Sequence, residues 1–182
     1  MGVIMVRITV SGHPGSGTST LVGLLEKHYN WTSINGGHIF REEAKQRGMT
    51  LEAFGQLCAS DLEVDKNLDR LLKDQMLEDA AHIFESRLSG WWAYQLELPC
   101  IRIWVQVEPE IRATRVGARE GWSMDECLKR NQERMEVDLK RFSELYGLNP
   151  EDSTPYTHII DCSDLNAQEV FTVVVDIVEG LK

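Results

Sequence analysis

The stretch "SGHPGSGTST", residues Ser11–Thr20, decides the fold of this chain. It follows an apolar run and precedes "LVGLLEKHY", in which Leu21, Leu24 and Leu25 recur at helical spacing. A strand, a glycine-rich turn and a helix in this order are typical of a phosphate-binding loop. We therefore expect the loop to join the first strand to the first helix and to bind phosphate groups.

The glycines allow the backbone to turn sharply and to bring bare N–H groups against phosphate oxygens. The following helix directs the positive end of its dipole at the same anion. Ser19 is placed to ligate Mg²⁺, whereas Thr18 occupies the position where such loops usually carry lysine. The alternative is a simple turn that caps a helix, with Thr18 or Ser19 as the N-cap.

The bulk properties predict one domain, residues 1–182, with a net charge of -10. This charge repels nucleic acids and anionic membranes, so we expect neither as a partner, and we expect a monomer. Four cysteines without a C-x-x-C pair indicate reduced thiols and a cytoplasmic protein. No segment approaches the length of a membrane span.

Short apolar runs alternate with stretches of helical period, which predicts parallel strands joined by crossover helices. The expected strands are Val3–Ser11, Thr32–Asn35, Ala81–Glu85, Ile101–Val107 and His158–Asp161. The run "IRIWVQV" is almost continuously apolar, which indicates a strand buried on both faces.

Three helix starts are marked by a cap residue three positions before a glutamate. These pairs are Ser60 with Glu63, Ser123 with Glu126, and Asn166 with Glu169. Between the first of them and the third strand, an apolar stripe of helical spacing is expected to face the core. Its members are Leu68, Leu71, Leu72 and Met76.

A phosphate ligand in an acidic protein needs local positive charge. Arg112, Arg115 and Arg119 share one helix face beyond the fourth strand, and Lys129, Arg130, Arg134, Lys140 and Arg141 follow. This concentration indicates an anion-binding region. The alternative is a solvated helix face that is balanced by Glu120, Glu126, Glu133, Glu136 and Asp138.

Two further arginines stand where strands end. Arg41 follows the second strand and Arg87 the third, so both are expected at the crevice where open α/β folds bind ligands. Glu85 occupies the position of an acid that steadies Mg²⁺ or its waters. The alternative is an ion pair between Glu85 and Arg87.

Five segments resemble the archaeal-type cytidylate kinases in order and spacing, across nearly the whole chain. They are "GHPGSGTST", "GGHIFREEAKQRGMTLEAF", "ESRLSGWWA", "EIRATRVGAREGWSMDE" and "ERMEVDLKRFSELYGL". The resemblance implies a three-layer α/β/α P-loop NTPase-type fold, with a five-stranded parallel sheet and a helical arginine-rich lid. It also implies transfer of the γ-phosphate of ATP, with Mg²⁺, to CMP or dCMP.

The resemblance assigns roles residue by residue. The loop residues Gly12, His13, Pro14, Gly15, Ser16, Gly17, Thr18, Ser19 and Thr20 would hold the ATP phosphates. Ser19 and Glu85 would serve the metal, and the lid residues Arg112, Arg115 and Arg119 would be catalytic. Arg41, Arg87, Arg134, Asp138 and Arg141 would bind the acceptor.

Some readings stay open. "ESR" stands where the family's "EGR" is expected, which bears on the roles of Glu85 and Arg87. His13 has no assigned chemistry, and Trp91 and Trp92 either wall the acceptor base or pack in the core. The acceptor could be UMP, AMP or a metabolite alcohol, and a non-catalytic nucleotide-binding module is the alternative outside the enzymes.

Overall fold

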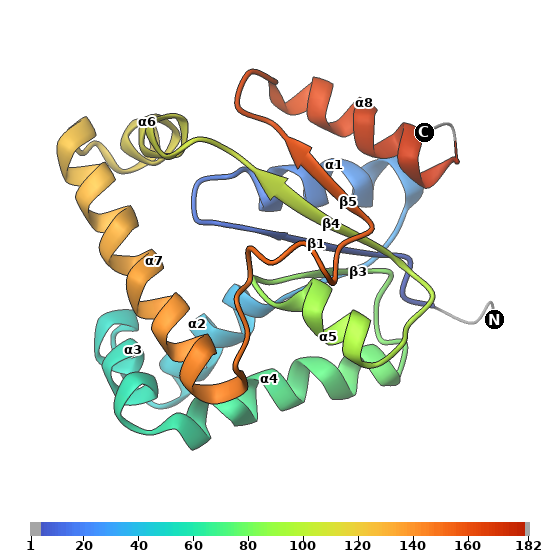
Figure 1. Cartoon of the computed structure of the whole chain (residues 1–182). Helices are drawn as coiled ribbons and strands as arrows, with labels where there is room; N and C mark the ends of the chain where they lie inside the picture. The colour runs from blue at the N-terminus through green and yellow to red at the C-terminus, as the bar shows by residue number, and fades with distance from the viewer. Residues whose placement is uncertain (1–4, 181–182) are drawn as a thin grey trace.

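The computed structural model describes residues 5–180, without the side chains of residues 51, 52, 59 and 119. Its centre is a sheet of parallel strands in the order β2-β3-β1-β4-β5 (Figure 1). The strands are β1 (Ile8–Gly12), β2 (Ser33–Asn35), β3 (Ile83–Glu85), β4 (Ile101–Gln106) and β5 (His158–Asp161). The expected five-stranded parallel sheet is confirmed, with the bounds of β5 as predicted. Val3 and Ile4, in the first expected strand, lie outside the described residues.

Helices follow and cover the strands. They are α1 (Thr18–Tyr29), α2 (Gly36–Gln46), α3 (Leu51–Ser60), α4 (Leu62–Leu77), α5 (Ser89–Gln95), α6 (Pro109–Glu120), α7 (Met124–Tyr146) and α8 (Ala167–Val178). Within residues 5–180, no helix combines the length and the apolarity that a bilayer crossing requires.

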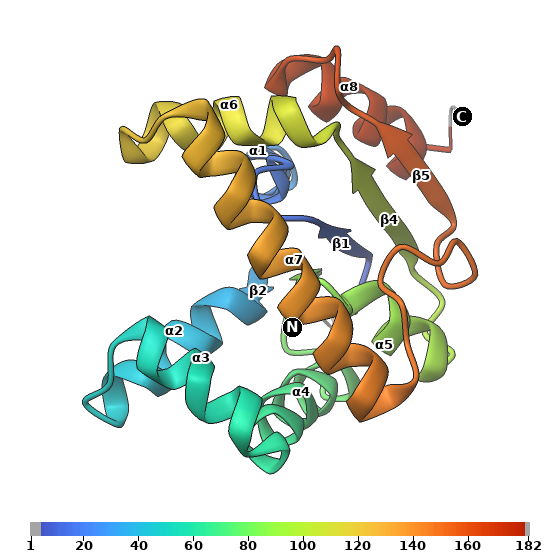
Figure 2. The ribbon, with the colours of Figure 1, turned by 60° about the vertical axis from the view of Figure 1, so that its left-hand side comes forward.

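Two apolar layers enclose the sheet. On one face, side chains of α1 and α8 such as Leu25 and Val174 pack against Ile8 and Ile103. On the other, residues of α4, α5 and α7 pack around Phe84. Consecutive residues 103–105 of β4 are buried, which confirms a strand covered on both faces. Figure 2 shows α7 extending from α6 to the region of α4 and α5.

The predicted cap of α4 is wrong by one residue. Asp61 is the N-cap, and its carboxylate accepts a hydrogen bond from the backbone N–H of Glu63. Ser60 instead ends α3, and its hydroxyl donates to the carbonyl of Leu57. Two helices meet at this point, so the predicted boundary is present but Ser60 ends the first helix and Asp61 caps the second.

The other two predicted starts hold. Ser123 accepts from the backbone N–H of Glu126, although the Glu126 carboxylate pairs with Arg130 rather than reaching back. Asn166 and Glu169 form a complete capping box.

The apolar stripe of α4 is only partly buried. Leu72 and Met76 are fully buried, and Leu68 packs at the edge of the cluster formed with α2 and α3. Leu71 is 46% exposed, so its predicted place in the core is wrong.

Candidate functional site

The loop Gly12–Thr20 joins the carboxyl end of β1 to α1, as the sequence indicates. Gly15 and Gly17 have φ angles of +85° and +88°, a region that residues with a Cβ rarely adopt. A Cβ on Gly15 would also lie 2.8 Å from the backbone oxygen of Arg112. The loop therefore requires glycine both for its conformation and for its contact with α6.

The amino end of α1 is open. Its N-cap is Gly17, no side chain caps it, and no acidic residue lies in its first turn. The alternative of Thr18 or Ser19 as a capping residue is therefore wrong. The first N–H groups of a helix have no partner within the helix, so this end presents uncompensated donors to an anion.

Ser19 and Glu85 meet beside this loop. The Ser19 hydroxyl donates to Glu85 Oε1 at 2.8 Å, and Asn35 Nδ2 donates to the other carboxylate oxygen. Asn35 also caps α2 by accepting from the N–H of His38. Glu85 thus contacts Ser19 rather than Arg87. Sequence reasoning missed Asn35, whose place between a strand and two glycines was the only signal.

The Ser19–Glu85 pair fits the chemistry of Mg²⁺. This ion takes oxygen ligands, keeps several of its waters and binds through one carboxylate or hydroxyl together with phosphate oxygens. In the part of the chain that the structure describes, no group of three acidic, histidine or cysteine side chains could hold a metal by itself. The pair therefore offers oxygen donors of the kind that Mg²⁺ takes, and the ion's remaining ligands would have to be waters and phosphate oxygens.

Arg112 and Arg115 lie on one face of α6 and both contact the loop region. Arg115 donates to the carbonyls of Ser16, Cys162 and Leu165 at 3.2 to 3.4 Å. Arg112 is 4% exposed, and its Nε donates to the Val107 carbonyl. Burial lowers the pKa of Arg112, and its Nη1 is buried with no hydrogen-bond partner among the described residues.

The remaining basic residues of α6 and α7 divide into two groups. Lys129, Arg130 and Lys140 form exposed ion pairs with glutamates four residues away on α7. For these three, the reading as a solvated helix face is the right one. Arg119 lies in α6, and its side chain is outside the described part of the structure.

Arg87 and Arg141 belong to a buried cluster of charges. Arg87 pairs with Asp138, which also accepts from Arg141 Nη2 at 3.0 Å. Arg141 Nε lies 2.7 Å from Asp65 of α4. The cluster thus joins the carboxyl end of β3 to α4 and α7. Asp65 was missed, because no local pattern relates it to an arginine 76 positions away.

The pKa values reflect this burial. Desolvation lowers the pKa of Arg87 to about 10, and the charge of Asp138 opposes part of this change. Desolvation also raises the pKa of Asp65 to about 6, against the attraction of Arg141. Arg87 therefore remains protonated at neutral pH, and its charge reaches His13 of the loop, whose pKa it helps to lower.

The chain is similar to known proteins over most of its length. A family model described as an AAA domain matches residues 11–127, from the loop to the first turn of α7. A cytidylate kinase of Methanopyrus kandleri is 37% identical over 177 residues, covering 93% of this chain and 91% of that protein. The cytidylate kinase of Pyrococcus abyssi is 38% identical over 167 residues, covering 92% of this chain and 90% of its own.

The chain belongs to the cytidylate kinase family.

Solved structures support the fold alone. An uncharacterized protein from Eubacterium ventriosum superposes with a TM-score of 0.72 at 14% identity, covering 96% of this chain and 99% of its own. A shikimate kinase from Acinetobacter baumannii gives 0.62 at 12% identity, covering 99% and 96%. The fold of this chain therefore also occurs in proteins with other names, among them a shikimate kinase.

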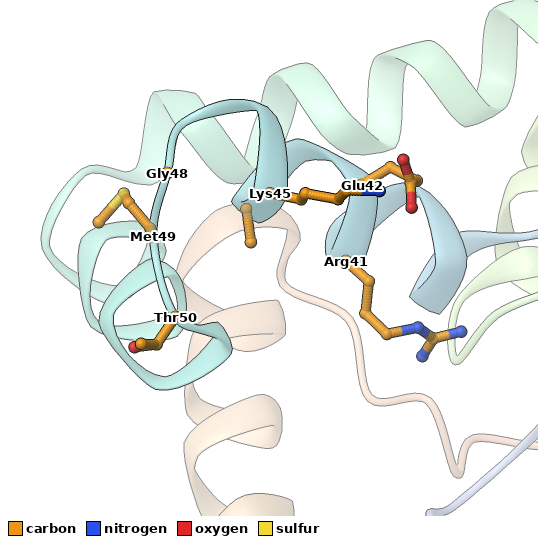
Figure 3. A pocket seen from close by; sticks show the side chains of 7 residues that line it. Arg41, Glu42, Lys45, Gly48, Met49 and Thr50 are labelled. Carbon is orange, nitrogen blue, oxygen red and sulfur yellow. The ribbon is translucent and has the colours of Figure 1, made fainter.

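Arg41 and Arg134 lie outside the buried cluster of this cytidylate kinase. Both are exposed, although the charge of Arg134 contributes to lowering the pKa of Arg87. Arg41 borders a shallow hollow of about 500 Å³ between α2 and α3, lined also by Lys45, Met49 and Thr50. Its guanidinium points away from Met49 and Thr50 (Figure 3). The hollow and the charged end of Arg41 therefore face different ways.

His13 and the two tryptophans have structural partners. His13 Nε2 lies 2.6 Å from Glu151 Oε1, and its ring meets the edge of Trp104. Burial lowers the pKa of His13. Trp91 donates to the Asn149 carbonyl, and Trp92 is fully buried. In this cytidylate kinase the tryptophans pack in the core.

Proposed function

We propose that this chain transfers the γ-phosphate of ATP to CMP, and also to dCMP. Membership of the cytidylate kinase family gives the reaction class. The proposal rests on one edge of the sheet, the one formed by the carboxyl ends of the strands. There, the glycine loop with its uncapped helix, the Ser19–Glu85 pair and the buried arginines beyond β3 occur together. A donor phosphate and an acceptor phosphate both find positive partners at this edge.

The loop Gly12–Thr20 holds the phosphates of ATP through its N–H groups and the amino end of α1. Ser19 and Glu85 would hold Mg²⁺, which would neutralise charge on the transferring phosphoryl group. Thr18 supplies no charge in the lysine position. Its methyl group lies 3.0 Å from the point where a Cβ on Gly12 would be, so Thr18 packs against the loop.

Arg112, Arg115 and Arg119 are the proposed catalytic residues. Phosphoryl transfer spreads negative charge over the equatorial oxygens, and fixed positive groups stabilise that charge. Arg115 is already bound to the loop through the carbonyl of Ser16, and Arg112 has a buried donor without a partner. These two arginines provide the charge that Thr18 lacks.

The acceptor site comprises Arg41, Arg87, Arg134, Asp138 and Arg141. Arg87 and Arg141 contact the same carboxylate of Asp138, so the three side chains are already arranged around one point. Arg41 and Arg134 are exposed at its border and approach the nucleotide as it binds. Catalysis then consists of positioning and electrostatic stabilisation, and the exclusion of water suppresses hydrolysis of ATP.

An ADP-release assay with CMP, dCMP, UMP, AMP and shikimate tests the proposal. We expect turnover with CMP and dCMP to exceed that with the other acceptors by at least tenfold. A different preferred acceptor would contradict the substrate assignment. ATP binding without release of ADP in the presence of any of these acceptors would instead identify a non-catalytic nucleotide-binding module.

The same proposal extends to the cellular compartment and the oligomeric state of the protein. The four cysteines are free and buried, which suits a reducing compartment, and we propose that the protein acts in the cytoplasm as a monomer. Light scattering on the purified chain gives its mass directly: 20.7 kDa is expected, and twice that value would refute the monomer.

A further inference from the structure

Ser86 has an unusual place between two residues of the proposed site. It follows Glu85, which accepts from Ser19, and precedes Arg87, which pairs with Asp138. The sequence resemblance leads us to expect glycine here, and this chain carries serine instead. The inference below rests on the proposed function and adds one residue to its acceptor site.

The backbone of Ser86 is fixed by a second serine. Ser89 Oγ lies 3.3 Å from the N–H of Ser86, which donates to it, and Ser89 itself donates to the carbonyl of Ser86. Ser89 also contacts Val10 of β1 and the hydroxyl of Ser11. The backbone of Ser86 is therefore held next to the start of the phosphate loop and does not lie in a free turn.

The side chain of Ser86 packs against the first residue of α2. A Cβ on Gly36 would lie 2.9 Å from the Cβ of Ser86, so a glycine at position 36 makes room for the serine. The Ser86 hydroxyl oxygen is nevertheless buried without a hydrogen-bond partner among the described residues. A buried hydroxyl without a partner is costly, and a ligand that accepts its hydrogen bond removes this cost.

The groups around Ser86 favour an anionic ligand. In the first turn of α2, Asn35 caps the N–H of His38, whereas the N–H groups of Gly36 and Gly37 have no partner within the helix. Arg41 Nη1 lies 3.4 Å from the point where a Cβ on Gly37 would be, so its guanidinium reaches the same turn. Both oxygens of the nearby Glu85 already accept hydrogen bonds. The Ser86 side chain and the Arg41 guanidinium thus lie beside the first two residues of α2, Gly36 and Gly37 respectively.

We propose that the Ser86 hydroxyl donates a hydrogen bond to the 5′-phosphate of the nucleoside monophosphate acceptor. A phosphate dianion offers three terminal oxygens, enough to accept from Ser86, from the first turn of α2 and from Arg41. Ser86 thereby helps to select an acceptor that carries a phosphate over the corresponding nucleoside.

Ser86→Ala is the sharpest test, because alanine keeps the Cβ that packs on Gly36 and removes only the hydroxyl. We expect the KM for CMP to rise roughly tenfold, as for loss of a hydrogen bond to a charged group. The KM for ATP and the inhibition constant of cytidine should change little, and Tm of the ligand-free protein should rise, because the costly unpartnered hydroxyl is gone. Ser86→Gly should raise the KM for CMP by a similar factor.

The control is Ser33→Ala in β2, whose hydroxyl bonds Glu26 at 2.7 Å, where β2 begins. It should leave the KM for CMP unchanged. A KM for CMP within twofold of wild type in Ser86→Ala would overturn the inference, as would equal losses for CMP and cytidine. The wild-type substrate panel tests the proposed function separately, and the variants are compared with whichever monophosphate that panel selects. A chain that accepts no monophosphate overturns both.

Discussion

Replacement of Gly15 by alanine should damage the phosphate loop more than any other glycine substitution near it. The backbone at Gly15 has φ of +85°, which costs a residue with a Cβ about 1 to 2 kcal/mol. The added Cβ would also lie 2.8 Å from the backbone oxygen of Arg112 and 3.1 Å from Val116. Overpacking of this kind costs a further ~1 to 3 kcal/mol, because α6 has to move.

The chain offers two glycines that separate these contributions. Gly17 has φ of +88° but only Arg115 Nη1 at 3.8 Å from an added Cβ, so Gly17→Ala carries the backbone cost alone. Gly23 lies within α1 with nothing inside 4 Å, so Gly23→Ala gains roughly 1 kcal/mol of helix propensity.

The three glycine variants are compared by their Tm in thermal unfolding and by their KM for ATP. For a chain of this size, 1 kcal/mol corresponds to about 2 to 4 °C in Tm. We expect Gly23→Ala to raise Tm by about 3 °C, Gly17→Ala to lower it by about 4 °C, and Gly15→Ala to lower it by about 10 °C. Gly15→Ala should also raise the KM for ATP at least tenfold. Equal effects of Gly15→Ala and Gly17→Ala would refute the contact between the loop and α6.

Three further predictions concern charge. Arg115→Ala should lower turnover with CMP at least tenfold, because its guanidinium bonds the Ser16 carbonyl. The control Arg130→Ala removes a surface ion pair and a contact with the Trp122 ring, and should leave turnover unchanged. An unchanged rate in Arg115→Ala would refute the catalytic assignment. Burial raises the pKa of Asp65 to about 6, so the folded protein binds the proton more tightly than the unfolded chain, and ionisation lowers stability as pH rises from about 4 to 6. Asp65→Asn should therefore be more stable than wild type at pH 8 by denaturant titration, with the difference shrinking as pH falls through 6; a difference independent of pH would contradict this. Thr18→Lys should change turnover with CMP by less than tenfold, and a gain of orders of magnitude would show that the arginines do not compensate.

Local patterns predicted the sheet and the loop well. The order of strand, glycine turn and helix around Gly15 depends on residues close in sequence, and so does the capping box at Asn166. Both were therefore visible in a single stretch of sequence. The start of α4 was displaced by one residue because Ser60 and Asp61 are equally good cap residues.

Long-range partners were not predictable in the same way. The spacing of Arg112 and Arg115 showed that they share a face, but the burial of Arg112 depends on contacts with the loop. Asp65 meets Arg141 only because α4 and α7 pack together. The exposure of Leu71 was not predictable either, because helical spacing predicts an apolar stripe but not how much of that stripe is buried.

Helix α7 is continuous over its 23 residues, from the turn after α6 to the packing site of Tyr146 on α4. At 1.5 Å per residue it acts as a lever about 35 Å long. A tilt of roughly 10° about its Tyr146 end would displace its Met124 end by about 6 Å. Asp138 and Arg141 lie about 12 Å and 8 Å from the Tyr146 end and would move by about 2 Å and 1 Å, so the acceptor side shifts much less than the Met124 end. Substitutions at the far end should then alter the timing of the catalytic cycle rather than the affinity for the acceptor.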